Sequence, residues 1–196
     1  MEWKDTVEEK NQHGLRVNGG VRKLTTMGMM AAVSIILVYL IHFPIFPMAD
    51  FLEYDPADIP IFICTFVYGP VSGLVLTVLA AGIQAVTVSA KSGLYGFLMH
   101  VIATGTFVLV AGSIYRRGKS KKRAILALAL GTLAMAAIMA PANLFITPIF
   151  MGAPVEAVRG MLLPIIIPFN FLKAGINSVI TFFLYKRVAR FIPHGE

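Results

Sequence analysis

The segment IPIFICTFVYGPVSGLVLTVLAAGIQAVTVSA, residues 59–90, decides how this chain folds, because it is long and carries no charge. A helix that crosses the hydrocarbon core of a membrane needs about 20 apolar residues. The segment is therefore too long for one such helix and short for two. Its centre reads YGPVSG, where Pro70 removes a backbone donor and disfavours helical structure at Gly69. The motif predicts a tight turn between two short helices.

The rest of the chain is apolar well beyond the range of soluble domains. Hydrophobic residues make up 57% and charged residues 14% of its 196 residues, and the mean hydropathy is +0.78. Soluble domains carry about 25% charged residues. Further apolar stretches with at most one Lys, Arg, Asp or Glu occupy residues 24–43, 94–115, 124–141 and 161–185. We therefore expect an all-α integral membrane protein that crosses the cell membrane several times.

The basic residues decide between one and two helices in residues 59–90. With two helices, the loop RRGKSKKR (116–123) lies on the same side as Arg22 and Lys23, and basic residues collect on the cytoplasmic side. The sequence thus predicts six transmembrane helices with both termini cytoplasmic. The expected organisation is a cytoplasmic tail (1–22), a six-helix membrane domain (23–191) and a C-terminal tail (192–196). The net charge of +7 then reflects membrane orientation, and we expect no nucleic-acid partner.

The outer loop between the first two helices, PIFPMADFLEYDPA (44–57), carries more apolar surface than a connection needs. One interpretation is a gating loop that covers a pocket, in which Phe51, Leu52 and Tyr54 contact a ligand. The other is an amphipathic hairpin that rests on lipid headgroups.

The end of this loop, DPAD, has the pattern of a helix start. Asp55 is placed as the N-cap, Pro56 takes the first helical position, and Asp58 lies near the positive end of the helix dipole. We expect a structural role for both acids first and a ligand contact second.

Three polar residues interrupt the last apolar stretch, LLPIIIPFNFLKAGIN. Asn170, Lys173 and Asn177 share one helical face. A cation at bilayer depth costs about 2.5–3.5 kcal/mol on insertion scales, so such groups usually face an interior cavity. Pro164 and Pro168 precede them and are expected to bend or delay the helix.

The fifth stretch adds Asn143, flanked by Pro141 and Pro148, which predicts a broken helix with a carboxamide at matching depth. A carboxamide can donate to a carbonyl and accept from an imide N–H. These residues favour a flat heteroaromatic ligand that carries both groups.

Other polar and small residues leave two interpretations each. His100 either faces the pocket or packs between helices, and Gln84 and Thr87 are expected to form interhelical hydrogen bonds. Gly28 and Ala32 have the spacing of a close helix contact, either within the protein or with a partner.

No motif in the chain indicates an enzyme. A Ser/His/Asp set, HExxH, paired acids at membrane depth and the phosphate-binding GxxxxGK are all missing from the sequence. We expect no metal and no cofactor, and transport would need a separate ATPase.

The ordered motifs FLEYDPADIP, YGPVSG, GTFVLVAGSIYRRGKSKK, GTLAMAAIMAPANLFITPIF and IIPFNFLKAGINSVITFFLYKR resemble those of the riboflavin-specific S components of energy-coupling factor (ECF) vitamin transporters. The resemblance covers residues 22–191. It implies a membrane protein, surrounded by lipid, that captures a vitamin from outside under a loop lid. Its implied partners are a transmembrane coupling subunit and two cytosolic ATPase subunits.

By position, the resemblance places Asn170 and Lys173 at the isoalloxazine ring of riboflavin and Asn143 in the same cavity. Asn177 matches one turn deeper, where it either meets the ligand or joins helices. His100 departs from the asparagine expected there, which leaves open the contacts of the sugar-alcohol tail.

The resemblance also places Gly28 and Ala32 at the docking surface for the coupling subunit, where relatives carry two alanines. The alternative function is an S component for another vitamin, such as FMN, pantothenate, folate or a pyrimidine precursor. Because Lys173 is the sole cation expected at depth, a neutral flavin is favoured.

Overall fold

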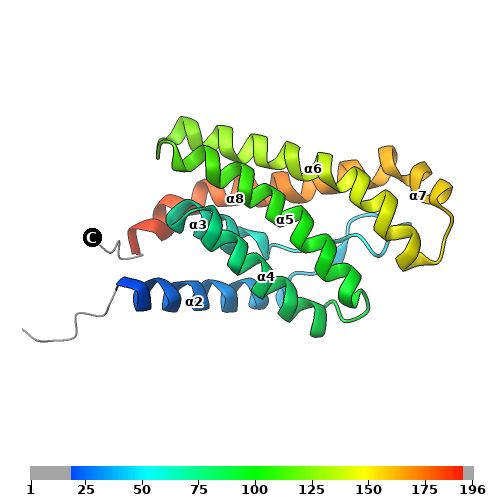
Figure 1. Cartoon of the computed structure of the whole chain (residues 1–196), viewed down its shortest axis with the longest axis horizontal. Coiled ribbons are helices and arrows are strands. Elements are labelled where there is room, and N and C mark those ends of the chain that lie inside the picture. Colours follow the sequence, from blue (N-terminus) through cyan, green and yellow to red (C-terminus); the bar gives the residue numbers. More distant parts are fainter. Residues whose placement is uncertain (1–18, 192–196) are drawn as a thin grey trace, which may run out of the picture.

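The computed structural model describes residues 19–191, which form a bundle of helices with one short hairpin (Figure 1). The helices are α2 (Gly19–Leu40), α3 (Asp58–Tyr68), α4 (Pro70–Val86), α5 (Gly93–Arg116), α6 (Lys121–Met151), α7 (Val155–Met161), the π-helical η1 (Leu162–Ile166) and α8 (Ile167–Phe191). The hairpin strands β1 (Phe43–Pro44) and β2 (Glu53–Tyr54) pair antiparallel.

Four stretches of the described chain are long and apolar enough to cross a membrane. They are Gly19–Leu40, Gly93–Arg116, Lys121–Met151 and the run Val155–Arg190, which joins α7, η1 and α8. Two shorter apolar helices, α3 and α4, complete the bundle. The mainly helical architecture that the sequence predicts is therefore confirmed.

Residues 59–90 form two helices, as their central motif predicts. The turn between α3 and α4 lies at Gly69, whose φ of +92° is a conformation that favours glycine, and Pro70 begins α4. With 11 residues, α3 rises only about 16 Å, roughly half the thickness of a hydrocarbon core.

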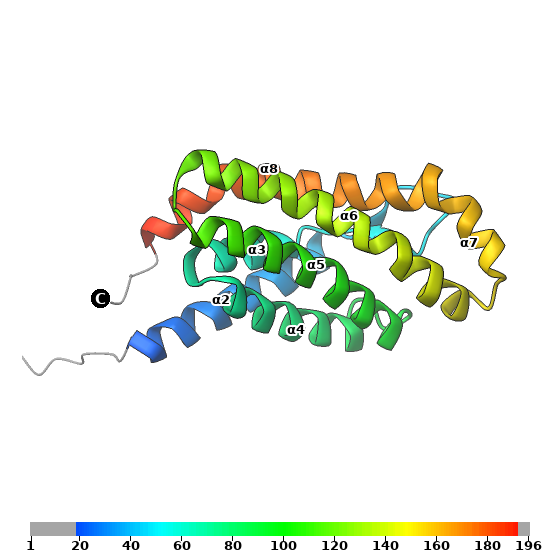
Figure 2. The ribbon, with the colours of Figure 1, turned by 45° about the horizontal axis from the view of Figure 1, so that its top comes forward.

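The two ends of the bundle differ in character (Figures 1 and 2). The start of α2 and the end of α8 lie at one end, together with the connection from α5 to α6, and we call this the terminal end. The opposite end carries the hairpin and α7, and we call it the hairpin end. Both views show that α8 runs back to the end of the bundle at which α2 begins.

Small residues let α3, α4 and α5 approach closely. A Cβ on Gly73 of α4 would lie 2.7 Å from Val108 Cγ1, and one on Gly112 of α5 would lie 2.8 Å from Thr65 Cγ2. Gly73 therefore serves packing inside the protein.

Proline affects the two polar helices differently. The expected break in the fifth helix is wrong, because α6 continues through Pro141 and Pro148 to Met151, well beyond the span that we expected to end at Pro141. Prolines are tolerated in membrane helices where neighbouring groups satisfy the freed backbone. The last helical run is irregular near its start. Pro164 lies inside η1, where backbone hydrogen bonds join residues five apart instead of four.

Candidate functional site

The loop that the sequence predicts to be a lid, residues 44–57 (called the lid loop below), packs against the protein through part of its length. Its buried apolar residues share one hydrophobic cluster with the last helical run. The cluster contains Ala49 and Leu52 from the loop and Val158, Ile165, Ile166 and Phe169 from α7, η1 and α8. Burial of Ala49 and Leu52 against the last helical run favours a loop that covers part of the protein, while Met48 on the same loop is 79% exposed.

Asp55 fixes the end of the lid loop to the start of α3 and to α8. Its Oδ1 accepts from the Ala57 backbone N–H at 3.0 Å, and its Oδ2 accepts from Lys173 Nζ at 2.7 Å. Lys173 Nζ also lies 3.4 Å from the Glu53 carbonyl oxygen. The predicted N-cap role of Asp55 is wrong, because α3 begins at Asp58 with Ala57 as its N-cap and Pro56 lies before the helix. Asp55 instead stabilises the turn before α3 through the Ala57 N–H and is the ion-pair partner of the lysine.

Asp58 is the centre of a second, fully buried polar group. Thr104 on α5 donates to its Oδ1 at 2.8 Å, and Asn177 Nδ2 on α8 lies 3.4 Å from its Oδ2. His100 Nε2 lies 3.4 Å from Oδ1. Tyr54 joins the group by donating to Asn177 Oδ1 at 3.0 Å. The carboxylate therefore holds α3, α5 and α8 together.

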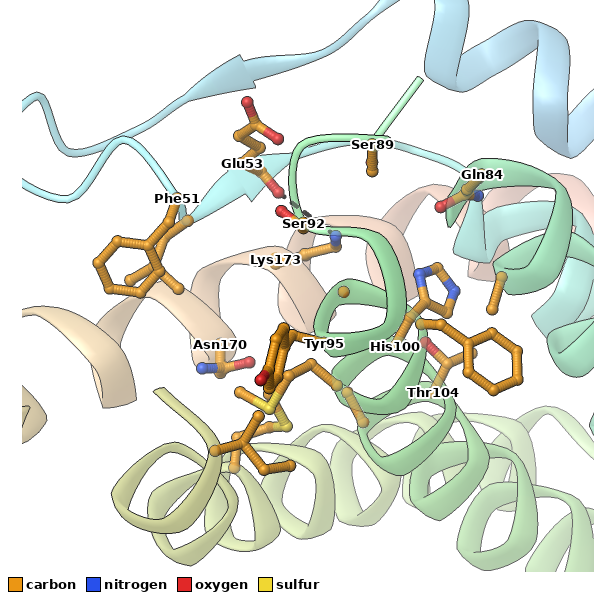
Figure 3. A pocket seen from close by; sticks show the side chains of 18 of the residues that line it. Phe51, Glu53, Gln84, Ser89, Ser92, Tyr95, His100, Thr104, Asn170 and Lys173 are labelled. Carbon is orange, nitrogen blue, oxygen red and sulfur yellow. Dashed lines mark hydrogen bonds between the residues drawn. The ribbon is translucent and has the colours of Figure 1, made fainter. Parts of the chain in front are cut away.

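A cavity of about 150 Å³ lies between the lid loop and helices α4, α5, α6 and α8 (Figure 3). Six of the eight residues that we predicted as ligand contacts line it. They are Phe51, Leu52, His100, Asn143, Asn170 and Lys173.

Asn170 and Asn143 present amides to this cavity from α8 and α6. Each donates one N–H to the carbonyl oxygen four residues earlier, Ile166 for Asn170 and Met139 for Asn143, both at 2.8 Å. Asn143 Oδ1 also accepts from Thr147 at 2.9 Å. Since a carboxamide has two N–H donors, each amide retains a donor for a ligand.

The two remaining predicted contacts, Asn177 and Tyr54, lie beside the cavity and do not line it. Asn177 is fully buried and donates to the Asp55 carbonyl oxygen at 3.2 Å. Its contacts agree with the helix-joining role that the sequence left as an alternative.

Sequence reasoning missed part of the cavity wall. Gln84 lines the cavity instead of joining helices, and Thr87 bonds the Ile83 carbonyl of its own helix. Tyr95 and Phe150 add a pair of rings to the lining, with centroids 5.7 Å apart. A glutamine in an otherwise apolar helix was the available indication, but its helical position alone does not show what it faces.

The small residues of α2 face outward. Gly28 and Ala32 are exposed, and an added Cβ on Gly28 would meet nothing within 4 Å. The buried face of α2 is a different one, which includes Met27, Met30 and Ser34. Of the two interpretations that the sequence allows, the structure excludes a packing seam inside the protein.

Comparison with known proteins agrees with this architecture. Residues 22–185 match the family model described as "ECF transporter, substrate-specific component". The chain is 27% identical over 177 residues to the riboflavin transporter RibU of Staphylococcus aureus (strain TCH60), covering 87% of this chain and 92% of the relative. It is 26% identical over 180 residues to the riboflavin transporter FmnP of Bacillus subtilis (strain 168), covering 88% and 94%.

A solved structure has the same fold. The structure titled "Structure and mechanism of the S component of a bacterial ECF transporter" superposes with a TM-score of 0.75 at 29% sequence identity. The match covers 88% of this chain and 98% of that one. The family model spans most of the chain, and the apolar helices and the covered polar cavity fit its description. This chain is an integral membrane protein that belongs to the family of substrate-specific components of ECF transporters.

Proposed function

We propose that this chain binds riboflavin at the lid-covered cavity and delivers it through an ECF transporter. The observation that carries the proposal is the convergence of Lys173, Asn170 and Asn143 on one cavity beneath the lid loop. Amides from two helices and one cation match the carbonyl and imide edge of a flavin ring. The printed names of the RibU and FmnP relatives agree with this ligand.

The charges around the cavity favour a neutral ligand. Among the described residues that line the cavity, Glu53 and Asp55 are acidic, and Lys173 is the single lysine or arginine. That lysine is already paired with Asp55 at 2.7 Å. A phosphate or carboxylate would enter a site with no uncompensated lysine or arginine charge, which is unfavourable in a partly buried environment. Riboflavin is therefore preferred over FMN, pantothenate and folate.

The size of the cavity supports a gating role for the lid loop. Pockets for ligands of this size usually measure about 300–1,000 Å³, whereas this cavity measures about 150 Å³. A flavin requires the cavity walls to move apart. Phe51 and Leu52 bring the loop into the lining, so an outward movement of the loop enlarges the cavity directly.

A titration of the purified protein tests the ligand. Binding to the protein should quench the fluorescence of riboflavin. An excess of a second compound should release riboflavin and restore its fluorescence only if that compound is also a flavin. FMN should compete more weakly, and pantothenate and folate should not compete. Absence of riboflavin binding at micromolar protein, or full competition by pantothenate, would refute the proposal.

The proposed topology has six spans with the terminal end in the cytoplasm. Eleven lysines and arginines of the described chain lie in Arg22–Lys23, 116–123 and 186–190, which agrees with the preference of basic residues for that side. Residues 23–191 then form one membrane domain between two cytoplasmic tails.

Cysteine labelling tests this topology. Because Cys64 is buried, a single cysteine placed at exposed Lys91 or at exposed Lys119 should show on which side of the membrane that position lies. A membrane-impermeant maleimide should label Lys91→Cys in intact cells and spare Lys119→Cys, and the reverse pattern would refute the topology.

We assign the outward face of α2 at Gly28 and Ala32 to the transmembrane coupling subunit, which acts with two ATPase subunits. The support is that these residues are exposed and leave room for close helix approach. Gly28→Leu should reduce co-purification of the coupling subunit, and unchanged co-purification would place the docking surface elsewhere.

A further inference from the structure

A second cavity lies at the terminal end of the bundle and shares no lining residue with the cavity beneath the lid loop. It measures about 510 Å³, and α3, α5, α8 and the connection after α5 form its walls. Three aromatic rings line it, those of Phe66, Tyr115 and Tyr185. The first two rings stack with centroids 4.3 Å apart, and Tyr185 meets Phe66 edge-on at 5.5 Å.

The hydroxyl of Tyr185 has no assigned role inside the protein. The residue is 3% exposed, and its Oη is buried without a hydrogen-bond partner among residues 19–191. Buried polar groups in native proteins are nearly always hydrogen-bonded. A bond between this hydroxyl and that of the neighbouring Tyr115 would still leave one of the two protons to donate. The wall therefore calls for an acceptor atom inside the cavity.

The border of the cavity is positively charged. The basic residues that line it are Lys119, Lys186 and Arg190. All three are exposed, and none forms an ion pair with another described residue. The acids of the described chain lie in residues 50–58 and at Glu156, and none of them lines this cavity. The acceptor that fits here is therefore an anion.

The depth of the cavity in the membrane indicates which anion. Tyr115 and Arg190 lie at the ends of two stretches that are long and apolar enough to cross a membrane, Gly93–Arg116 and Val155–Arg190. The cavity is thus placed where hydrocarbon meets the polar surface, the level at which aromatic residues and phospholipid headgroups gather. Basic pockets between transmembrane helices on the cytoplasmic side bind anionic lipid headgroups. The terminal end is that side in the topology proposed above.

We propose that this second cavity binds the headgroup of an anionic phospholipid. The phosphate oxygens accept from the basic side chains at the border and from the Tyr185 hydroxyl, while the aromatic wall contacts the apolar part of the lipid. A free phosphate has no apolar part to match that wall. The inference does not depend on which ligand occupies the cavity beneath the lid loop. Because a ligand that binds only the folded state stabilises it, the lipid should raise the unfolding midpoint.

Three soluble probes distinguish the possible sources of the phosphate. Dioctanoyl phosphatidylglycerol carries an anionic headgroup, dioctanoyl phosphatidylcholine carries the same chains with a zwitterionic headgroup, and glycerol phosphate has no chains. Each probe is titrated against the purified full chain in a neutral detergent. The apparent dissociation constant is taken from the rise of the thermal unfolding midpoint.

The titrations are run on the wild type, Tyr185→Phe and a matched pair of arginine variants. Arg190→Gln removes a charge that lines the cavity. Arg187→Gln removes the same charge from the same helix at an exposed position that does not line it. A cooperative unfolding transition shows that each variant is folded.

The wild type should bind phosphatidylglycerol at least about tenfold more tightly than either other probe. Arg190→Gln should weaken phosphatidylglycerol binding about fivefold, as expected for one basic residue at an anionic surface, and Arg187→Gln should weaken it less than about twofold. Tyr185→Phe should weaken it about tenfold, because hydrogen bonds to charged groups are stronger than those between neutral groups.

Several results would overturn the proposal. Equal losses for the two arginine variants would indicate a diffuse attraction of charge, and unchanged binding by Tyr185→Phe would remove the buried hydroxyl from the site. Equal effects of the two lipids would indicate a response to the chains alone, and an equal effect of glycerol phosphate would indicate a site for free phosphate. A surface that receives a protein partner instead would show no lipid effect, and Arg190→Gln would then reduce co-purification of the coupling subunit.

Discussion

Replacing Lys173 with methionine should damage both the ligand site and the stability of the fold. The Nζ to Oδ2 distance between Lys173 and Asp55 is 2.7 Å, and the side chains are only 12% and 8% exposed. Removing one partner of a buried ion pair costs about 3–5 kcal/mol, since the other charge is left unpaired. We expect the lower part of this range, because Asp55 Oδ1 keeps the Ala57 N–H.

A second substitution separates these two effects. Asp55→Asn removes the charge but retains an oxygen that can accept from the Ala57 N–H. In the double variant Lys173→Met/Asp55→Asn neither charge remains, and replacing a whole buried pair is often close to neutral. The double variant should regain about 2 kcal/mol relative to Lys173→Met but should not regain riboflavin binding.

The measurements are the thermal unfolding midpoint in one detergent and the riboflavin dissociation constant from flavin quenching. The expected order of midpoints is wild type, double variant, Lys173→Met. The reasoning about the ion pair is wrong if the unfolding midpoint of the double variant is no higher than that of Lys173→Met. The site assignment is wrong if either variant binds riboflavin as tightly as the wild type.

Three further substitutions test other parts of the structure. Asn170→Leu should weaken riboflavin binding tenfold or more, because it removes the proposed amide contact with the ring, and unchanged binding would contradict that placement. Gly73→Ala should destabilise the protein by about 1–3 kcal/mol through overpacking, whereas Gly28→Ala should lower the unfolding midpoint little or not at all, and equal effects would contradict the packing described above. His42→Ala removes the 2.7 Å contact of His42 Nε2 with Glu53 Oε2 on the lid loop. Riboflavin should then dissociate about two to three times faster in stopped flow, since such partly exposed contacts contribute up to about 1 kcal/mol, and an unchanged rate would show that this contact does not hold the loop in place.

Local chemistry made much of the fold predictable. The turn at Gly69 follows from the adjacent Pro70 and from the uncharged length of residues 59–90. The inward direction of Asn170 and Lys173 follows from their shared helical face and from the cost of placing a cation in lipid. Both inferences needed only neighbours in the sequence.

Tertiary contacts account for what the sequence left out. The partner of Lys173 lies 118 residues away at Asp55, and no local pattern connects the two. That Gln84 Nε2 is buried without a hydrogen-bond partner among the described residues is visible only once α4 and α5 are placed around one cavity. The continuity of α6 through Pro141 also depends on its surroundings, because proline alone predicts a break.

The short third helix explains why the lid and the fold depend on the same residues. Because α3 covers only about half the depth of a membrane, the buried backbone of residues 54–57 occupies the depth that a longer helix would fill. Irregular backbone at such depth is tolerated where protein buries it, and here Asp55, Lys173 and Asn177 supply its polar contacts. Opening that detached this part of the loop would therefore break the start of α3. If the loop gates the proposed site, we therefore expect the movement to include Phe51 and Leu52, which line the cavity and lack the polar side-chain contacts of Asp55.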